Sequence, residues 1–234
     1  SSCARDDLAR CLVENPLNLF WYHDDVDQWL ELRAAYGERL GADAVHIVAP
    51  GHWLHARYAE LFPVLRDRPW REIPHGLGRV LSRPPAHQTE KALTESAARL
   101  RILIPGRLAP QKGLHLFSAM LDELAEFAEV LLLGCGDFGL PFQEVDHVEV
   151  IADYDNAALG EHVRAFVPDC ALLMSILPES FSYTLSEMFA LGVPVVATRL
   201  GAFAERIEEG RDGFLVDPAP EAVLQCLRAL SQDR

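Results

Sequence analysis

The sequence predicts an α/β protein with parallel β-sheets in two domains. Short apolar runs with the length and content of buried strands recur along it, for example residues 101–105 and 170–174. Helical segments of ten or more residues separate these runs, and that alternation is typical of parallel α/β architecture. Residues 78–98 are polar, contain two consecutive prolines and have no apolar period. We therefore expect a linker there, between a first domain at residues 1–77 and a second at residues 99–234.

Composition narrows the class of protein. The chain has 234 residues, of which 50% are hydrophobic, enough to bury a sizeable core. Its net charge of −14 argues against nucleic acid or an anionic membrane as the main partner. Its five cysteines are odd in number and scattered, which suits free thiols in a reducing compartment.

The sequence has no segment typical of a membrane span or a leader. Its longest apolar runs are far shorter than the roughly 18 residues that a span needs, and the first residues lack signal-peptide character. We therefore expect a soluble, cytoplasmic protein. A peripheral membrane association through parts outside this sequence is left open.

Periodicity and breakers place the individual elements. In the first domain we expect helices at residues 8–13, 26–39 and 53–65, and three extended segments at residues 17–22, 44–49 and 71–73. In the second we expect strands at residues 101–105, 129–134, 148–152, 170–174 and 195–197. Helices are expected from the loop at 106–113 to about residue 127, at residues 157–166, from residue 182 to the glycine at 192, and at residues 219–230.

The stretch at residues 177–197 is the first candidate site. Ser182 is placed to cap the predicted helix, and the N–H groups that follow it would point into the preceding loop. Such a helix end attracts phosphate. Two carboxylates bracket it, Glu179 in the loop and Glu187 in the helix. An alternative for Glu187 is that it only complements the helix dipole, which is worth about 0.3–1 kcal/mol.

The second candidate site is the glycine-bounded loop at residues 106–113. Arg107 and Lys112 lie in it, at the carboxyl end of a predicted strand, where an anion is expected. A forked guanidinium and a compact ammonium together suit a diphosphate. The Gly-to-Lys spacing, with no Ser or Thr after the lysine, excludes a Walker A motif. The alternative is a pair of solvated surface cations.

The first domain offers weaker candidates. His23 follows the extended segment at 17–22, and ligands gather at such strand ends, although a surface His-Asp loop is the alternative. Residues 25–27 read Asp-Val-Asp, but we discount a metal site there because short acidic patterns are common. His52 and His55 are spaced for one face of a helix; with no third ligand nearby, we interpret them as exposed or packing residues. We expect no metal site.

Together these segments resemble the retaining glycosyltransferases of the GT-B fold, family 4, also described as glycosyl transferases group 1. Their donor segment has a proline-glutamate, a phenylalanine two residues on, a second glutamate eight residues after the first, and a small-residue turn before P-V-V. The matching residues are Glu179, Phe181, Glu187, Gly192, Pro194, Val195 and Val196. Ser180 and Ser182 depart from the pattern, because many members have glycine there. The loop at 106–113 matches the family's G-R-L-x-x-x-K-G in full.

Further matches extend the resemblance from about Trp21 to Leu230; it is highly specific over residues 101–218 and looser before that. They include V-A-P-G-H-W-L at residues 48–54, with Gly51 in place of serine, and I-P-H-G at residues 73–76, with His75 in place of asparagine. Past the donor segment lie a G-A-x-x-E turn and a hairpin-like end at residues 210–218. The resemblance implies a GT-B type fold, with a Rossmann-like donor domain preceded by an incomplete second Rossmann-like domain.

The resemblance also implies roles for individual residues. The loop cations would hold the diphosphate, the helix amides the distal phosphate, Glu187 the ribose, and Glu179 and Phe181 the sugar, while His23 would face the sugar from the first domain. The implied donor-binding residues are Gly106, Arg107, Lys112, Gly134, Gly136, Tyr154, Glu179, Phe181, Ser182, Tyr183, Thr184 and Glu187. The implied catalytic residues are Glu179, His23, Arg107 and Lys112.

The implied activity is transfer of a sugar, with retention, from a nucleotide-diphosphate sugar of UDP or GDP type to a hydroxyl. The acceptor would be a saccharide, a lipid or a small molecule, and no metal or cofactor would be needed. The alternative is a nucleotide-sugar-binding module, or a fragment of a larger transferase whose missing domain comes from elsewhere. An epimerase or phosphorylase of the same fold is a third possibility, and the sequence shows no lysine context for a pyridoxal cofactor.

Overall fold

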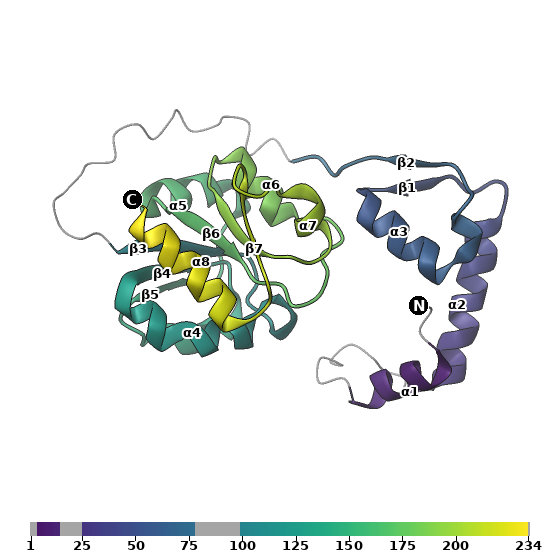
Figure 1. Cartoon of the computed structure of the whole chain (residues 1–234), viewed down its shortest axis with the longest axis horizontal. Helices are drawn as coiled ribbons and strands as arrows, with labels where there is room; N and C mark the ends of the chain where they lie inside the picture. Colours follow the sequence, from purple (N-terminus) through teal and green to yellow (C-terminus); the bar gives the residue numbers. More distant parts are fainter. Residues whose placement is uncertain (1–3, 15–24, 78–98, 234) are drawn as a thin grey trace. The chain divides into compact units, whose positions relative to one another are not determined.

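The computed structural model describes residues 4–14, 25–77 and 99–233. They belong to two compact units, Ser1–Pro74 and His75–Arg234, both drawn in Figure 1. The linker predicted at residues 78–98 lies outside the described residues, and so does His23.

The first unit contains helices and a two-stranded parallel sheet among its described residues. These elements are α1 (Arg5–Glu14), α2 (Val26–Gly41), β1 (Ile47–Ala49), α3 (His52–Leu61) and β2 (Trp70–Glu72). The helix predicted at residues 53–65 ends early, because Pro63 has no N–H to continue it and instead begins a 3₁₀ turn, Pro63–Leu65. The extended segment predicted at residues 17–22 lies outside the described residues.

Two motifs of the first unit have local structural roles. The Asp25 carboxylate accepts hydrogen bonds from two backbone N–H groups at the start of α2, so this part of the acidic triplet is a helix cap. His52 and His55 pack against Trp70, with ring centroids 5.0 and 4.2 Å apart. No group of three possible metal-ligating His, Cys, Asp or Glu side chains occurs in the described ranges.

The second unit is a six-stranded parallel sheet in the order β5-β4-β3-β6-β7-β8. The strands are β3 (Leu100–Pro105), β4 (Ala128–Leu133), β5 (Val148–Ile151), β6 (Cys170–Leu173), β7 (Val195–Thr198) and β8 (Gly213–Val216). The helices are α4 (Leu114–Phe127), α5 (Leu159–Phe166), α6 (Tyr183–Ala190), α7 (Ala202–Arg206) and α8 (Pro220–Gln232). Each predicted strand and helix of this unit is therefore observed, with shifts of a few residues at its ends.

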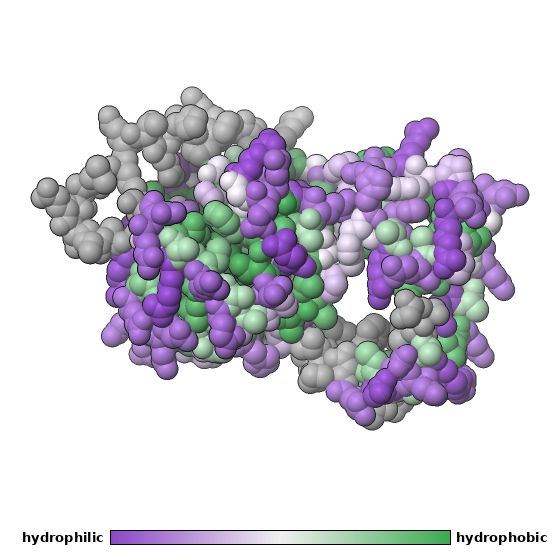
Figure 2. Space-filling view, in the orientation of Figure 1, coloured by the Kyte–Doolittle hydropathy of each residue, from purple (hydrophilic) through white to green (hydrophobic). Residues whose placement is uncertain are grey.

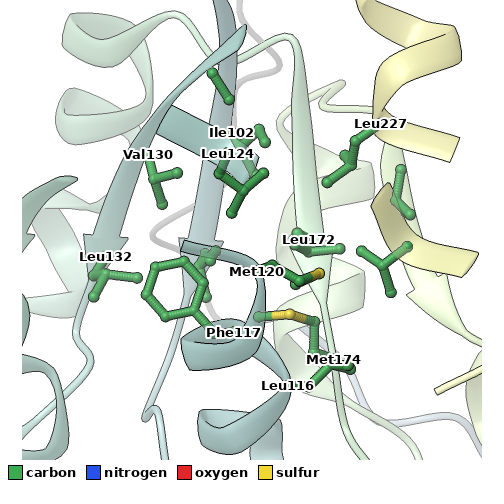
Figure 3. Close-up of a cluster of buried hydrophobic side chains, with 14 of the residues drawn as sticks. Ile102, Leu116, Phe117, Met120, Leu124, Val130, Leu132, Leu172, Met174 and Leu227 are labelled. Atoms are coloured by element: carbon green, nitrogen blue, oxygen red, sulfur yellow. The ribbon is translucent and has the colours of Figure 1, made fainter. Parts of the chain in front are cut away.

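Both faces of this sheet are buried, which is why its strands read as continuous apolar runs. On one face, Phe117 and Met120 of α4 and Leu227 of α8 pack on side chains from β3, β4 and β6, as Figure 3 shows. On the other face, α5, α6 and α7 cover a second apolar cluster that includes Leu185 and Phe203. The sheet thus lies between two layers of helices. Because all of its strands are parallel, their carboxyl ends lie along the same edge.

The face drawn in Figure 2 carries many hydrophilic residues, in keeping with the net charge of −14, with hydrophobic residues exposed between them. Within the described ranges, the longest and most apolar helices are still too short or too polar to cross a membrane.

The strand order reverses direction at β3. The chain goes from β3 outward to β4 and β5, then returns to place β6 on the other side of β3. In open parallel sheets, ligands bind at such a switch point, outside the carboxyl ends of the strands. The loops after β3 and β6 are the two candidate sites predicted above, and the topology brings them together.

The prediction of a hairpin-like end at residues 210–218 is wrong. β8 pairs with β7 in parallel, after α7 has carried the chain back to the amino end of the sheet. A side chain at Gly213 would place its Cβ 2.2 Å from the Val195 carbonyl oxygen, so this glycine permits the close approach of the two strands. A tight turn closes just before it, where Gly210 has φ 77° and donates to the Gly213 carbonyl at 2.8 Å.

Candidate functional site

The loops after β3 and β6 enclose a cleft of about 70 Å³ at the switch point. Besides apolar residues at the strand ends, it is lined by Ser175 and by six of the predicted site residues. These are Gly106, Arg107, Lys112, Glu179, Ser182 and Thr184. Residues from distant parts of the sequence therefore converge at one edge of the sheet.

A larger cavity, of about 280 Å³, lies at the opposite edge of the same sheet. Arg99, Arg101 and His147 line it, at the amino ends of β3 and β5, together with acidic side chains. No predicted site residue lies there. We assign the site to the smaller cleft, because ligands of open parallel sheets bind at the carboxyl ends of the strands.

The loop after β3 follows the end of β4. Gly106 donates to the Leu133 carbonyl at 2.8 Å. Arg107 then passes Gly136: a Cβ added to this glycine would lie 3.8 Å from the guanidinium carbon. Gly136 has φ 66° and ψ −165°, a conformation that essentially only glycine adopts. In the described part of the chain, no carboxylate forms an ion pair with Arg107, so its charge is available to an anion.

Lys112 and Glu179 form an ion pair across the cleft, linking the two loops. The Glu179 carboxylate is 15% exposed and also accepts from the hydroxyl of Ser175, while Lys112 is 43% exposed. The backbone of Ser175 is also held in place, because the buried Thr198 hydroxyl donates to the Ser175 carbonyl at 2.6 Å. Glu179 is thus fixed in place, with a cation as its neighbour.

The second loop leads into α6 through Ser182. Its hydroxyl caps the helix by accepting from the N–H of Leu185 at 3.2 Å, as predicted from the sequence. The backbone N–H groups of Tyr183 and Thr184 have no acceptor among the described residues. Free amides at a helix start attract negative charge.

Ser182 has an unusual backbone. Its φ of 68° and ψ of 97° lie in a region that favours glycine over residues with a side chain. Beside it, Phe181 is buried and Tyr183 is 55% exposed. His75 contacts both rings, with centroids 4.8 Å from Phe181 and 5.1 Å from Tyr183.

Sequence reasoning missed Arg206, at the end of α7. Its guanidinium donates to the carbonyls of Phe181 and Ser182, at 2.6 and 3.0 Å, and to the Ser186 hydroxyl at 2.7 Å. It also lies 4.0 Å above the Phe181 ring. Burial lowers the pKa of Arg206. The nearby G-A-x-x-E turn was the only sequence signal, and it does not point to this arginine.

A further group lies near the ends of β4 and β5. A Cβ on Gly134 would come within 2.7 Å of the Tyr154 ring, so only glycine lets this ring pack here. Burial raises the pKa of Glu187. Burial, and then the negative charge of Glu187, raises the pKa of Tyr154. Gly134, Tyr154 and Glu187 therefore lie together in one half-buried group, and their roles at the nucleoside stay predictions.

Comparison with known proteins decides the family. The family model for glycosyl transferases group 1 matches residues 99–233, more than half of the chain. This chain belongs to that family. The match covers both loops of the cleft and the whole parallel sheet of the second unit.

Curated relatives are also glycosyltransferases. The phosphatidyl-myo-inositol mannosyltransferase of Mycobacterium leprae is 32% identical over 134 residues, which cover 53% of this chain and 34% of the relative. The lipopolysaccharide core biosynthesis mannosyltransferase LpsB of Rhizobium meliloti is 33% identical over 161 residues, 62% of this chain and 45% of the relative. The chain thus spans less than half the length of these relatives.

Solved structures show the same GT-B type fold. Sucrose-phosphate synthase from Thermosynechococcus elongatus matches with a TM-score of 0.66 at 21% identity, over 87% of this chain and 53% of the synthase. Anabaena HepE in complex with UDP and glucose matches with a TM-score of 0.62 at 18% identity, over 86% of this chain and 57% of HepE.

Proposed function

We propose that this chain transfers a sugar from a nucleotide-diphosphate sugar to an acceptor hydroxyl, with retention and without a metal. One observation carries the proposal: Arg107, Lys112, Glu179 and the start of α6 line one cleft, at the switch point of a group 1 glycosyltransferase domain. A cleft with two cations and free amides suits a diphosphate, and the adjoining carboxylate suits a polyhydroxylated sugar.

The diphosphate would lie between the two loops. Arg107 presents a forked donor without an ion-pair partner in the described chain, and Lys112 adds a point charge. The amides of Tyr183 and Thr184 would receive the distal phosphate. To reach the phosphate, the ammonium of Lys112 has to share or leave its contact with Glu179, and the phosphate replaces the carboxylate as its partner.

The nucleoside and the sugar would lie on either side of the diphosphate. Glu187, half-buried beside Tyr154, would accept hydrogen bonds from the ribose hydroxyls, and Tyr154 would lie at the base. Glu179 and Phe181 would border the sugar. His23, which lies outside the described residues, would approach the sugar from the first domain.

Breaking the bond between the anomeric carbon and the leaving phosphate places negative charge on the leaving oxygens. Fixed cations and helix amides in a small cleft stabilise that charge where it develops, so a metal is not needed. We propose that the acceptor hydroxyl attacks from the face that the phosphate leaves and passes its proton to that phosphate. Glu179 would then stabilise positive charge on the sugar rather than form a covalent bond to it, unlike the nucleophile of retaining glycosidases.

A second candidate is a nucleotide-sugar-binding module, active only with further polypeptide. The observation that favours it is the coverage: the chain spans 34% and 45% of the two mannosyltransferases named above. Binding without turnover would distinguish this candidate from the transferase. Under either candidate, four free thiols in the described residues suit the reducing cytoplasm.

The test is calorimetric titration of the chain with UDP, GDP and ADP, each with and without EDTA. The nucleotide that binds is then supplied as its sugar conjugate, and the anomeric configuration of any product is read by NMR. Binding, followed by release or transfer of sugar with retained configuration, is the expected result. Binding alone supports the module, an altered sugar still on its nucleotide indicates an epimerase, and no binding refutes both proposals.

A further inference from the structure

Ser182 is held in a strained backbone conformation at the start of α6. Among the described residues, only Val167 and Ser182 combine a side chain with a positive φ. An L-residue in such a region is strained by an amount equivalent to about one order of magnitude in an equilibrium constant. The hydroxyl cap on the N–H of Leu185 offsets part of this strain, but it also requires that the chain stay in this conformation.

Arg206 contacts the backbone on both sides of that strained residue. One of its terminal nitrogens donates to the Phe181 carbonyl at 2.6 Å and to the Ser182 carbonyl at 3.0 Å. These two oxygens belong to the peptide groups immediately before and after the φ and ψ bonds of Ser182. Fixing both of them restrains the two dihedral angles directly.

The other contacts of Arg206 leave it little freedom to move. Its second terminal nitrogen donates to the Ser186 hydroxyl one turn into α6, at 2.7 Å, and its guanidinium carbon lies over the Phe181 ring. In the described part of the chain it forms no ion pair with a carboxylate, and its donors go to neutral oxygens of the loop before α6 and of the first turn of α6. A rigid planar fork is suited to such bridging, whereas a lysine ammonium is not.

We propose that Arg206 is a positioning residue that clamps Ser182 in its positive-φ conformation, and thereby aims the Tyr183 and Thr184 amides at the donor diphosphate. This inference rests on the proposed function for its ligand, but the clamp itself does not. The pair Ser182 and Arg206 takes the place of a single glycine, which reaches the same conformation without strain. Arg206 is not a catalytic residue, because it lines no part of the cleft.

Substitutions of Arg206 and Ser182 should not have independent effects. Replacing Arg206 with methionine removes the clamp, and Ser182 then relaxes to a negative φ, which turns the amides away from the phosphate. Replacing Ser182 with glycine in the same chain makes the clamp unnecessary. The loss caused by the first change should therefore be largely repaired by the second, and such rescue is not expected if Arg206 only packs against its neighbours.

The experiment compares wild type, R206M, R206K, S182G and the double variant R206M/S182G, with R211M as a control. Arg211 is exposed, and its ion-pair partners among the described residues are Glu208 and Asp212, so its loss removes one positive charge without removing a contact of the clamp. Affinity for UDP, GDP and ADP is measured by calorimetry, and the unfolding midpoint by urea titration. We expect R206M to bind about tenfold more weakly than R211M, R206K to lie between them, and the double variant to recover at least about fivefold.

Three results overturn the proposal: unchanged affinity in R206M, no recovery in the double variant, or R206K equal to wild type. If wild type binds none of the nucleotides, the proposed function fails, and the urea midpoints still decide the inference. In that case S182G should raise the midpoint more in the R206M chain than in the wild-type chain. Equal effects in both chains would refute the clamp.

Discussion

Exchange of Glu179 for glutamine should have opposite effects on binding and on transfer. Lys112 is paired with Glu179, and the nucleotide's phosphate has to compete with this carboxylate for the ammonium. Glutamine keeps the shape and can still accept from Ser175, but it removes the negative charge. The competing partner of Lys112 is thereby weakened.

The size of the gain in binding follows from the exposure of the pair. Lys112 is 43% exposed and Glu179 is 15% exposed, so the pair is partly screened by water. A pair of this kind is worth about 0.2–1 kcal/mol, which corresponds to at most about a fivefold change in affinity. We therefore expect E179Q to bind sugar-free nucleotide diphosphate more tightly, by about 1.4-fold to fivefold, and to lose most of its sugar transfer.

The assay is calorimetry with the nucleotide that wild type binds, at low and high salt, beside a transfer assay with its sugar conjugate. E209Q is the matched control, because it removes the same charge from an exposed pair with Arg199. Tighter binding in E179Q but not in E209Q supports competition for Lys112. Weaker nucleotide binding in E179Q, or undiminished transfer, would refute the reasoning.

Three further predictions follow from the same site. K112A should weaken binding of the nucleotide diphosphate by about 1.5–3 kcal/mol, the usual contribution of a hydrogen bond to a charged group, and unchanged calorimetric affinity would remove Lys112 from the site. G134A should destabilise the chain by about 1–3 kcal/mol in urea unfolding, because its Cβ would come within 2.7 Å of the Tyr154 ring at a φ of 74°; a smaller loss would mean that the ring moves aside freely. Burial raises the pKa of Glu187 above 4.5, so this carboxyl binds its proton more tightly in the folded chain than in the unfolded chain. The free energy of unfolding therefore falls as the pH rises from the pKa of Glu187 in the unfolded chain toward its pKa in the folded chain. E187Q should flatten that part of the stability curve measured by urea titration between pH 4 and pH 7, and identical pH dependence in both chains would show that Glu187 titrates normally.

The resemblance to glycosyl transferases group 1 is confirmed, and so are the strands and helices predicted for the second unit. These features are encoded locally: an apolar run such as residues 170–174, a proline or glycine that ends it, and a capping serine all act within a few residues. Strand direction is not encoded in this way. The chain after α7 has the turn residues of a hairpin, yet β8 pairs in parallel with β7. The reason is that the connection between these two strands, which contains α7, packs on one face of the sheet and returns the chain to its amino end.

The sequence by itself determined the family, the α/β class and the loops that meet at the switch point, because the spacing of Arg107, Lys112, Glu179 and Glu187 can be recognised along the chain. The tertiary structure alone decided the pairing of Lys112 with Glu179, which lie 67 residues apart, and the contact of Arg206 with the Ser182 loop. The spacing of a motif can be read along the chain without knowing which elements pack together. The partners of a side chain are decided by which elements the buried sheet brings to the same edge, and no local pattern contains that information.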